Sequence, residues 1–160
     1  MKKEKLNKIG LNVKYSRKLA KMLNGLLADY SVFYQNVRGY HWQIKGEKFF
    51  ELHLKFEELY NDLFVKIDEI AERILTLGYE PEFRFTYYLK NARIKESGNG
   101  RNAGRCVKDI LNSLRVLLID QRQILDYASR SCDEGTAAMM SDYIREQEKL
   151  IWMYSAFLEK

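Results

Sequence analysis

The chain has little of the residues that interrupt helices. One of its 160 residues is proline, Pro81, and nine are glycine, so long stretches contain neither. Because proline disrupts helix interiors, its scarcity favours long helices over a β-sandwich or a doubly wound sheet. With 46% hydrophobic and 31% charged residues, the composition is typical of one globular domain that is long enough to bury a core.

Cysteine is almost as scarce. Cys106 and Cys132 are the two present, and their spacing matches no zinc or redox motif. We expect both to be small buried residues without chemistry. There is no disulfide framework, no signal peptide after the lysine-rich start, and no apolar run of membrane-spanning length. These absences favour a cytoplasmic protein that does not contact membranes.

Positive charge is concentrated at the start of the chain. The formal net charge is +5, yet the first 21 residues carry eight basic side chains and one acidic one, so the remainder is slightly acidic. We divide the chain into a short basic arm, residues 1–11, and a helical domain, residues 12–160. The arm is either a solubilising tail or a contact for nucleic acid. Its lysines are Lys2, Lys3, Lys5 and Lys8.

Apolar residues recur every three or four positions in four long segments, which is the period of an amphipathic helix. These segments span residues 12–40, 47–77, 105–130 and 136–158. Gly78 and Pro81 end the second one, and the link after them contains a shorter helical stretch at residues 83–94. The pattern predicts an all-α four-helix bundle with a short extra helix in the second-to-third connection. We assign the aromatic residues around 30–42 and 152–157 to its core.

The second long segment carries two stripes. Beside its apolar core stripe lies another that mixes apolar residues with carboxylates and a histidine. It consists of His53, Glu57, Tyr60, Phe64, Asp68, Ala71, Glu72 and Leu75. A helix of a monomeric bundle needs a single apolar stripe. The second stripe therefore predicts a surface that meets another subunit.

The two histidines of the chain stand on either side of a short turn. His41 ends the first segment and His53 begins the second, so both side chains come together. Glu57 follows His53 by one helical turn, and Asp68 and Glu72 form another such pair. Imidazole with carboxylate suits iron, manganese or zinc. Taken singly, each residue also has an ordinary interpretation. The histidines could be hydrogen-bonded or surface side chains, and Asp68 and Glu72 could form an ordinary solvated face, or Glu72 could pair with a nearby lysine or arginine.

Helix geometry limits how these groups can combine. His53 and Asp68 are separated by roughly 22 Å at ~1.5 Å per residue, too far for one metal site in one chain. If two copies of the helix pack antiparallel about a dyad near residues 60–63, His53 faces Asp68 and Glu72 of the partner subunit. Two identical shared sites then result, as an isologous interface requires. The arithmetic permits such sites without establishing them.

With these residues the chain resembles a known family, Dps (DNA-binding proteins from starved cells). The likeness covers residues 26–158 and is strongest over residues 34–78. It is carried by His41-Trp42, Lys45-Gly46, Phe49-Phe50, Leu52-His53, Ile67-Asp68-Glu69-Ile70-Ala71-Glu72-Arg73 and Lys149-Leu150-Ile151-Trp152-Met153. The spacing His-x11-His-x14-Asp-x3-Glu is specific, because it sets four potential ligands at fixed intervals along the chain.

The resemblance implies a dodecameric hollow shell of ferritin-like subunits that oxidises Fe²⁺ at two-fold interfaces and stores ferric mineral. By position, the implied ligands are His41 and His53 of one subunit with Asp68 and Glu72 of the partner subunit. Glu57 stands where the family often has aspartate, and it is implied to hold a second, weaker iron. The family's preferred oxidant is hydrogen peroxide rather than oxygen. These expectations make the protein a ferroxidase that protects the cell from oxidative damage.

The resemblance also implies roles for residues outside the ligand set. Trp42 and Trp152 match tryptophans that intercept stray oxidising equivalents, and Glu134 matches a residue of the iron-entry pores. An alternative function is that of a nucleoid-compacting DNA-binding protein that acts through the basic arm. An ordinary ferritin, with its di-iron site inside one bundle, is disfavoured because the chain lacks the Glu-x-x-His pattern of such sites.

Overall fold

The computed structural model describes residues 5–159, which form four long helices and one short one. The helices are α1 (Val13–Gln43), α2 (Phe49–Thr76), α3 (Phe85–Asn91), α4 (Ala103–Arg130) and α5 (Glu134–Leu158). No strand occurs within these residues, although Leu6 and Asn12 form an isolated bridge. The predicted all-α fold is confirmed, including the extra helix, and no described helix is long and apolar enough to cross a membrane.

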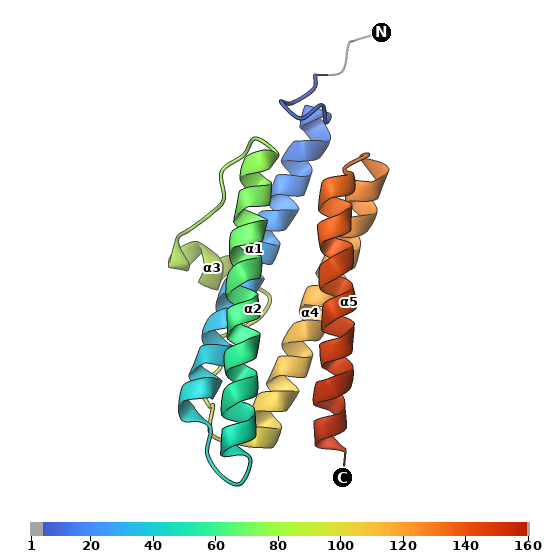
Figure 1. Cartoon of the computed structure of the whole chain (residues 1–160). Helices are drawn as coiled ribbons and strands as arrows, with labels where there is room; N and C mark the ends of the chain where they lie inside the picture. Colours follow the sequence, from blue (N-terminus) through green and yellow to red (C-terminus); the bar gives the residue numbers. More distant parts are fainter. Residues whose placement is uncertain (1–4, 160) are drawn as a thin grey trace.

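One long connection, between α2 and α4, runs the length of the bundle. Figure 1 shows α1 and α2 as an antiparallel pair, after which the link that carries α3 returns to the end where α2 began. Helix α4 therefore starts beside the α1–α2 turn, and α5 runs back antiparallel to α4. One long crossover between two helical hairpins is the topology of ferritin-like bundles. It places the α1–α2 turn and the α4–α5 turn at opposite ends of the molecule.

Side-chain caps and glycine set the helix ends. Asn12 and Asn102 accept hydrogen bonds from backbone N–H groups at the starts of α1 and α4, and Asp133 does the same for α5. Helix α2 ends at Gly78, whose φ of +91° is one that glycine adopts without strain. The N–H groups of Gly78 and Tyr79 donate to the last carbonyls of α2, which completes a Schellman motif.

Ion pairs to buried aspartates join the elements at the middle and at one end of the bundle. Asp29 of α1 accepts bonds from the Arg93 side chain and from two backbone N–H groups of the α3–α4 link, and Asp120 of α4 accepts a second bond from Arg93. Arg73 of α2 donates to the buried Asp133 in the α4–α5 turn at 2.5 Å. The first set of contacts holds the α3–α4 link against α1 and α4, and the second joins the end of α2 to the start of α5.

The described part of the basic arm is folded against the domain. Asn7 donates to Ser16 Oγ and to the carbonyl of Leu77, while its side-chain oxygen accepts from two N–H groups of the same turn. Lys5 and Lys8 extend from this turn and are exposed, whereas Lys2 and Lys3 lie outside the described residues. Residues 5–11 therefore have a defined conformation.

Two expectations about burial are wrong in part. Cys106 is buried, but Cys132 is exposed, because it occupies the tight α4–α5 turn with φ of +55°. Most aromatic residues of the two assigned stretches belong to the core, but Trp42 is 59% exposed, Trp152 68% and Phe157 37%. Both tryptophans lie near helix ends on outward-facing positions, where no other element of the described chain covers them.

Candidate functional site

His41 and His53 hold each other in place at the α1–α2 turn. Nδ1 of each ring lies 2.8 Å from the backbone carbonyl oxygen of the other histidine. Because a carbonyl oxygen can only accept, Nδ1 is the donor in both rings, which leaves Nε2 as the second ring nitrogen. The rings stack with centroids 3.7 Å apart and planes 20° from parallel. The result is a stacked pair of imidazoles in which both Nδ1 atoms are bonded to backbone carbonyls, so Nε2 of each ring is the nitrogen left to act as a ligand.

Aromatic neighbours complete this pair. Phe49 stacks on His53 with ring centres 5.0 Å apart, and Tyr60 and His41 meet edge to face with ring centres 5.3 Å apart. Gly46 allows the turn, since its φ of +103° lies in the region that glycine prefers. The sequence pattern did not single out Phe49 or Tyr60 as supports of the histidines. The sequence does hold a signal for this support: Phe49 lies four residues before His53 and Tyr60 seven after it, which places all three on one helix face.

The mixed stripe of α2 is open on the surface of the subunit. Its apolar members Phe64 and Leu75 are exposed, although large apolar side chains usually lie inside. Asp68 and Glu72 are exposed as well, and Glu57 is half-buried. No basic side chain among residues 5–159 forms an ion pair with any of these three carboxylates. The pairing of Glu72 with a neighbouring lysine or arginine is therefore not found in the described part of the chain, while the exposure of Asp68 and Glu72 fits a solvated face as well as a pair of free ligands.

The predicted ligands fall into two groups within one chain. The structure brings His41 and His53 together, with Glu57 on the same side of α2. Asp68 and Glu72 lie farther along the same unbroken helix, so they stand roughly 22 Å from His53. No cluster of three or more His, Cys, Asp or Glu side chains suited to a metal occurs in residues 5–159.

The remaining predicted residues lie apart from the histidine pair. Glu134 is the exposed first residue of α5, at the end of the bundle opposite the α1–α2 turn. Trp152 lies on the last turns of α5. Trp42 follows His41 directly, and the Arg38 guanidinium stacks over its ring at 4.8 Å. The roles proposed for these side chains stay predictions.

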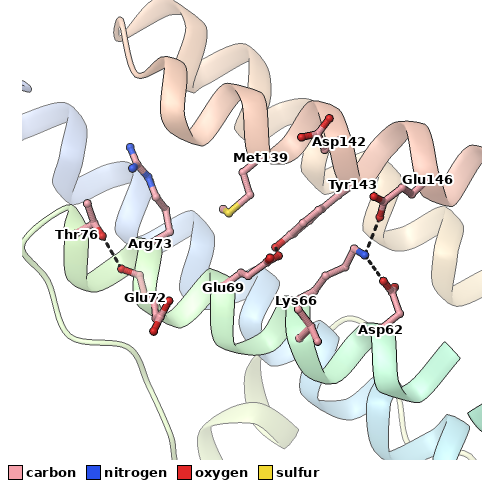
Figure 2. Close-up of a pocket in the computed structure, with 11 residues that line it drawn as sticks. Asp62, Lys66, Glu69, Glu72, Arg73, Thr76, Met139, Asp142, Tyr143 and Glu146 are labelled. Atoms are coloured by element: carbon pink, nitrogen blue, oxygen red, sulfur yellow. Dashed lines mark hydrogen bonds and ion pairs between the residues drawn. The ribbon is translucent and has the colours of Figure 1, made fainter. Parts of the chain in front are cut away.

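A second carboxylate-rich region lies between α2 and α5. It is a groove of about 630 Å³ lined by Asp62, Glu69, Glu72, Asp142 and Glu146, together with Lys66 and Arg73 (Figure 2). The sequence pattern missed Lys66, although it stands on the core stripe of α2 between Leu63 and Ile70. Glu72 lines this groove and also belongs to the mixed stripe, so the two regions meet at that residue.

Known proteins resemble this chain along nearly its whole length. The ferritin-like domain family matches residues 20–160. A DNA protection during starvation protein of Porphyromonas gingivalis is 43% identical over 158 residues, 99% of each chain. The crystal structure of a Dps protein from Vibrio cholerae O1, described as a ferritin-like diiron-carboxylate protein, superposes with a TM-score of 0.96. That structure is 53% identical and covers 99% of this chain and 100% of its own.

A more distant structure agrees. A Dps protein from Bacillus brevis has a TM-score of 0.88 at 36% identity and covers 91% of this chain and 98% of its own. Fold, sequence and the exposed stripe of α2 together define a ferritin-like protein. Within that superfamily, the chain belongs to the Dps miniferritin family.

Proposed function

We propose that this protein is a ferroxidase and iron store. It oxidises Fe²⁺, with hydrogen peroxide preferred to oxygen, at sites shared between two subunits, and it holds the ferric product inside a hollow dodecameric shell. The coarser assignment, to the Dps family, is supported by sequence and structure. The iron chemistry, the assembly and the cytoplasmic location are the proposal.

One observation carries it: α2 presents two halves of a ligand set on one open stripe. The imidazole pair stands at the start of the helix, and the carboxylates of Asp68 and Glu72, which form no ion pair within residues 5–159, stand near its end. An antiparallel second copy of α2 would bring each half against the other half of its partner. The exposed Phe64 and Leu75 would be buried by the same contact.

The residues suit the reaction. Neutral imidazole nitrogens and carboxylate oxygens bind Fe²⁺ and Fe³⁺ and leave positions open for an oxidant. In our proposal His41 and His53 bind the substrate iron from one subunit, and Asp68 and Glu72 of the partner subunit bind it from the other. Glu57 holds a second iron more weakly. Two irons each give one electron to hydrogen peroxide, which is reduced to water without forming hydroxyl radical.

Mixed shells of two inactive variants test the sharing of ligands. His53→Ala and Asp68→Ala each remove one ligand from every site. In a mixed dimer one site combines both lesions, while the other joins the intact His53 of one subunit to the intact Asp68 of its partner. Random pairing makes about half the dimers mixed, so about a quarter of the sites recover. Persistent inactivity in verified mixed shells would contradict the shared site.

A second candidate function, DNA binding, has its own observation. Exposed basic side chains continue from the arm onto the first turns of α1: Lys14, Arg17, Lys18 and Lys21. Twelve such surfaces on one shell would bind phosphates multivalently and release counterions, so affinity would fall steeply with salt. Gel shifts of Lys5→Gln/Lys8→Gln and Lys14→Gln/Lys18→Gln variants separate the arm from the helix. Unchanged shifts in both would leave the charge a solubilising feature.

A further inference from the structure

Lys66 lies almost inside the bundle, which is unusual for a lysine. Its side chain is 6% exposed, and it extends from α2 into the groove that α2 forms with α5 (Figure 2). The ammonium donates to the carboxylates of Asp62, one turn earlier on α2, and of Glu146 on α5, the latter at 2.8 Å. It also lies 5.1 Å from the centre of the Tyr143 ring. Two carboxylates from two helices and an aromatic face thus surround one positive charge.

This charge belongs to a polar layer to which every long helix contributes. Tyr30 of α1, Gln121 of α4 and Gln147 of α5 are buried and joined by hydrogen bonds, with both amide groups donating to the Tyr30 hydroxyl. Tyr143 links them to Lys66, since its ring centre lies 6.1 Å from that of Tyr30. Gln121 Oε1 is buried and has no hydrogen-bond donor.

The layer has the layout of a metal site with different side chains. In ferritin-like bundles that hold two metals in one subunit, the four helices project carboxylates and histidines inward at one level. Here phenol and amide groups replace most of those donors. The one formal cation of the layer is an ammonium attached to α2. A divalent ion in the same place would have to displace that ammonium from two carboxylates or lie beside it against charge repulsion.

We propose that the Lys66 ammonium is a built-in cation that occupies the position between Asp62 and Glu146 and keeps Fe²⁺ out of the subunit's own bundle. The iron then has only the inter-subunit stripe of α2 to bind. This inference rests on the proposed function for the identity of the excluded ion. It makes Lys66 a specificity-determining residue rather than a catalytic one.

The test counts Co²⁺ ions, used as an air-stable substitute for Fe²⁺, by titration calorimetry and visible absorbance. The parent is the His53→Ala shell, in which the shared site lacks a ligand. Adding Lys66→Gln is expected to raise binding by about one Co²⁺ per subunit, with new absorbance from carboxylate and amide oxygens. Further addition of Asp62→Asn should remove that gain. The matched control is Lys55→Gln, which deletes the same charge from an exposed ion pair on α2 and should add no ion.

No additional Co²⁺ in a correctly assembled Lys66→Gln shell would overturn the proposal. If that variant does not assemble, Glu146→Gln in a chain that keeps Lys66 decides instead. The proposal expects its Co²⁺ stoichiometry to equal that of the unmodified chain, and loss of an ion would show that metal binds beside Lys66. Failure of the proposed function would appear differently, as equal Co²⁺ binding by the unmodified chain and His53→Ala.

Discussion

Helix α2 carries carboxylates on two faces, and the two faces differ in what accompanies them. Toward α5, Asp62 is paired with Lys66 and Glu69 accepts a hydrogen bond from Tyr143, while Arg73 of the same face pairs with Asp133 of the α4–α5 turn. On the outward stripe, Asp68 and Glu72 have no basic partner among residues 5–159. Paired carboxylates contribute to the architecture of one subunit. Carboxylates without a basic partner, on an exposed and half-apolar stripe, are available to a ligand or to a second subunit.

The largest expected effect comes from breaking the outward face. Asp68→Ala should lower the rate of peroxide-dependent Fe²⁺ oxidation by about 100-fold or more, because loss of a ligand costs at least as much as loss of a group behind one. Stopped-flow absorbance of the ferric product measures it. Asp142→Ala removes an exposed aspartate from the α5 side, where it pairs with Arg145, and should retain most of the rate. Equal rates for the two variants would mean that the outward face has no special role.

Breaking the inward face should affect stability instead. Arg73→Ala leaves the Asp133 carboxylate, which is 1% exposed, without its partner. An uncompensated buried charge costs about 3–5 kcal/mol, so the denaturation midpoint should fall clearly at matched protein concentration. Arg122→Ala breaks an exposed pair with Glu148 and should cost only about 0–1 kcal/mol. A similar loss in both would show that burial of the Arg73 pair is unimportant.

Alkaline pH should weaken the inward face through its buried hydroxyls. Burial, and then the hydrogen bond to Glu69, raise the pKa of Tyr143, and burial raises the pKa of Tyr30. A hydroxyl whose pKa is higher in the folded than in the unfolded state contributes its full stabilisation below the unfolded pKa of about 10. Above that pH the unfolded state ionises first, and the contribution is lost as pH rises. The free energy of unfolding should therefore decline above about pH 10. Urea unfolding over a pH series should show a shallower decline for Tyr143→Phe.

The smallest expected effect concerns the support of His53 on the outward face. Phe49→Ala removes the ring that stacks on His53 and should weaken Co²⁺ binding a few-fold, by about 1 kcal/mol, the order of an aromatic pair. The adjacent Phe50 is 84% exposed, so Phe50→Ala is the matched control. Titration calorimetry on both variants compares them. Greater loss with Phe50→Ala would place the support of His53 elsewhere.

The sequence was sufficient for features set by local periodicity. Spacing of apolar residues located each long helix to within about three residues of its observed bounds, and Gly78 ended α2 as expected. The meeting of His41 and His53 followed from the short turn between two helices. Their reciprocal bonds to each other's backbone did not, because ring orientation depends on packing against Phe49 and Tyr60.

Features that depend on distant partners could not be read from periodicity. Lysine on a helix normally lies in solvent, and the burial of Lys66 requires Glu146, which is 80 residues away in the chain. The exposure of Trp42, Trp152 and Cys132 likewise depends on what covers the helix ends. Composition favours the core for these residue types, and only the tertiary arrangement shows that these three positions are open.

The crossed hydrogen bonds of His41 and His53 mean that the imidazole half of the site is assembled by folding itself. Each ring is anchored to backbone from the other helix, so neither side chain would have to search its rotamers if an ion bound as proposed. Freezing such side chains on binding usually costs of the order of 1 kcal/mol each. Here that entropy is lost once, during folding of the α1–α2 hairpin, and successive ions entering and leaving the site would meet the same preset geometry at every turnover.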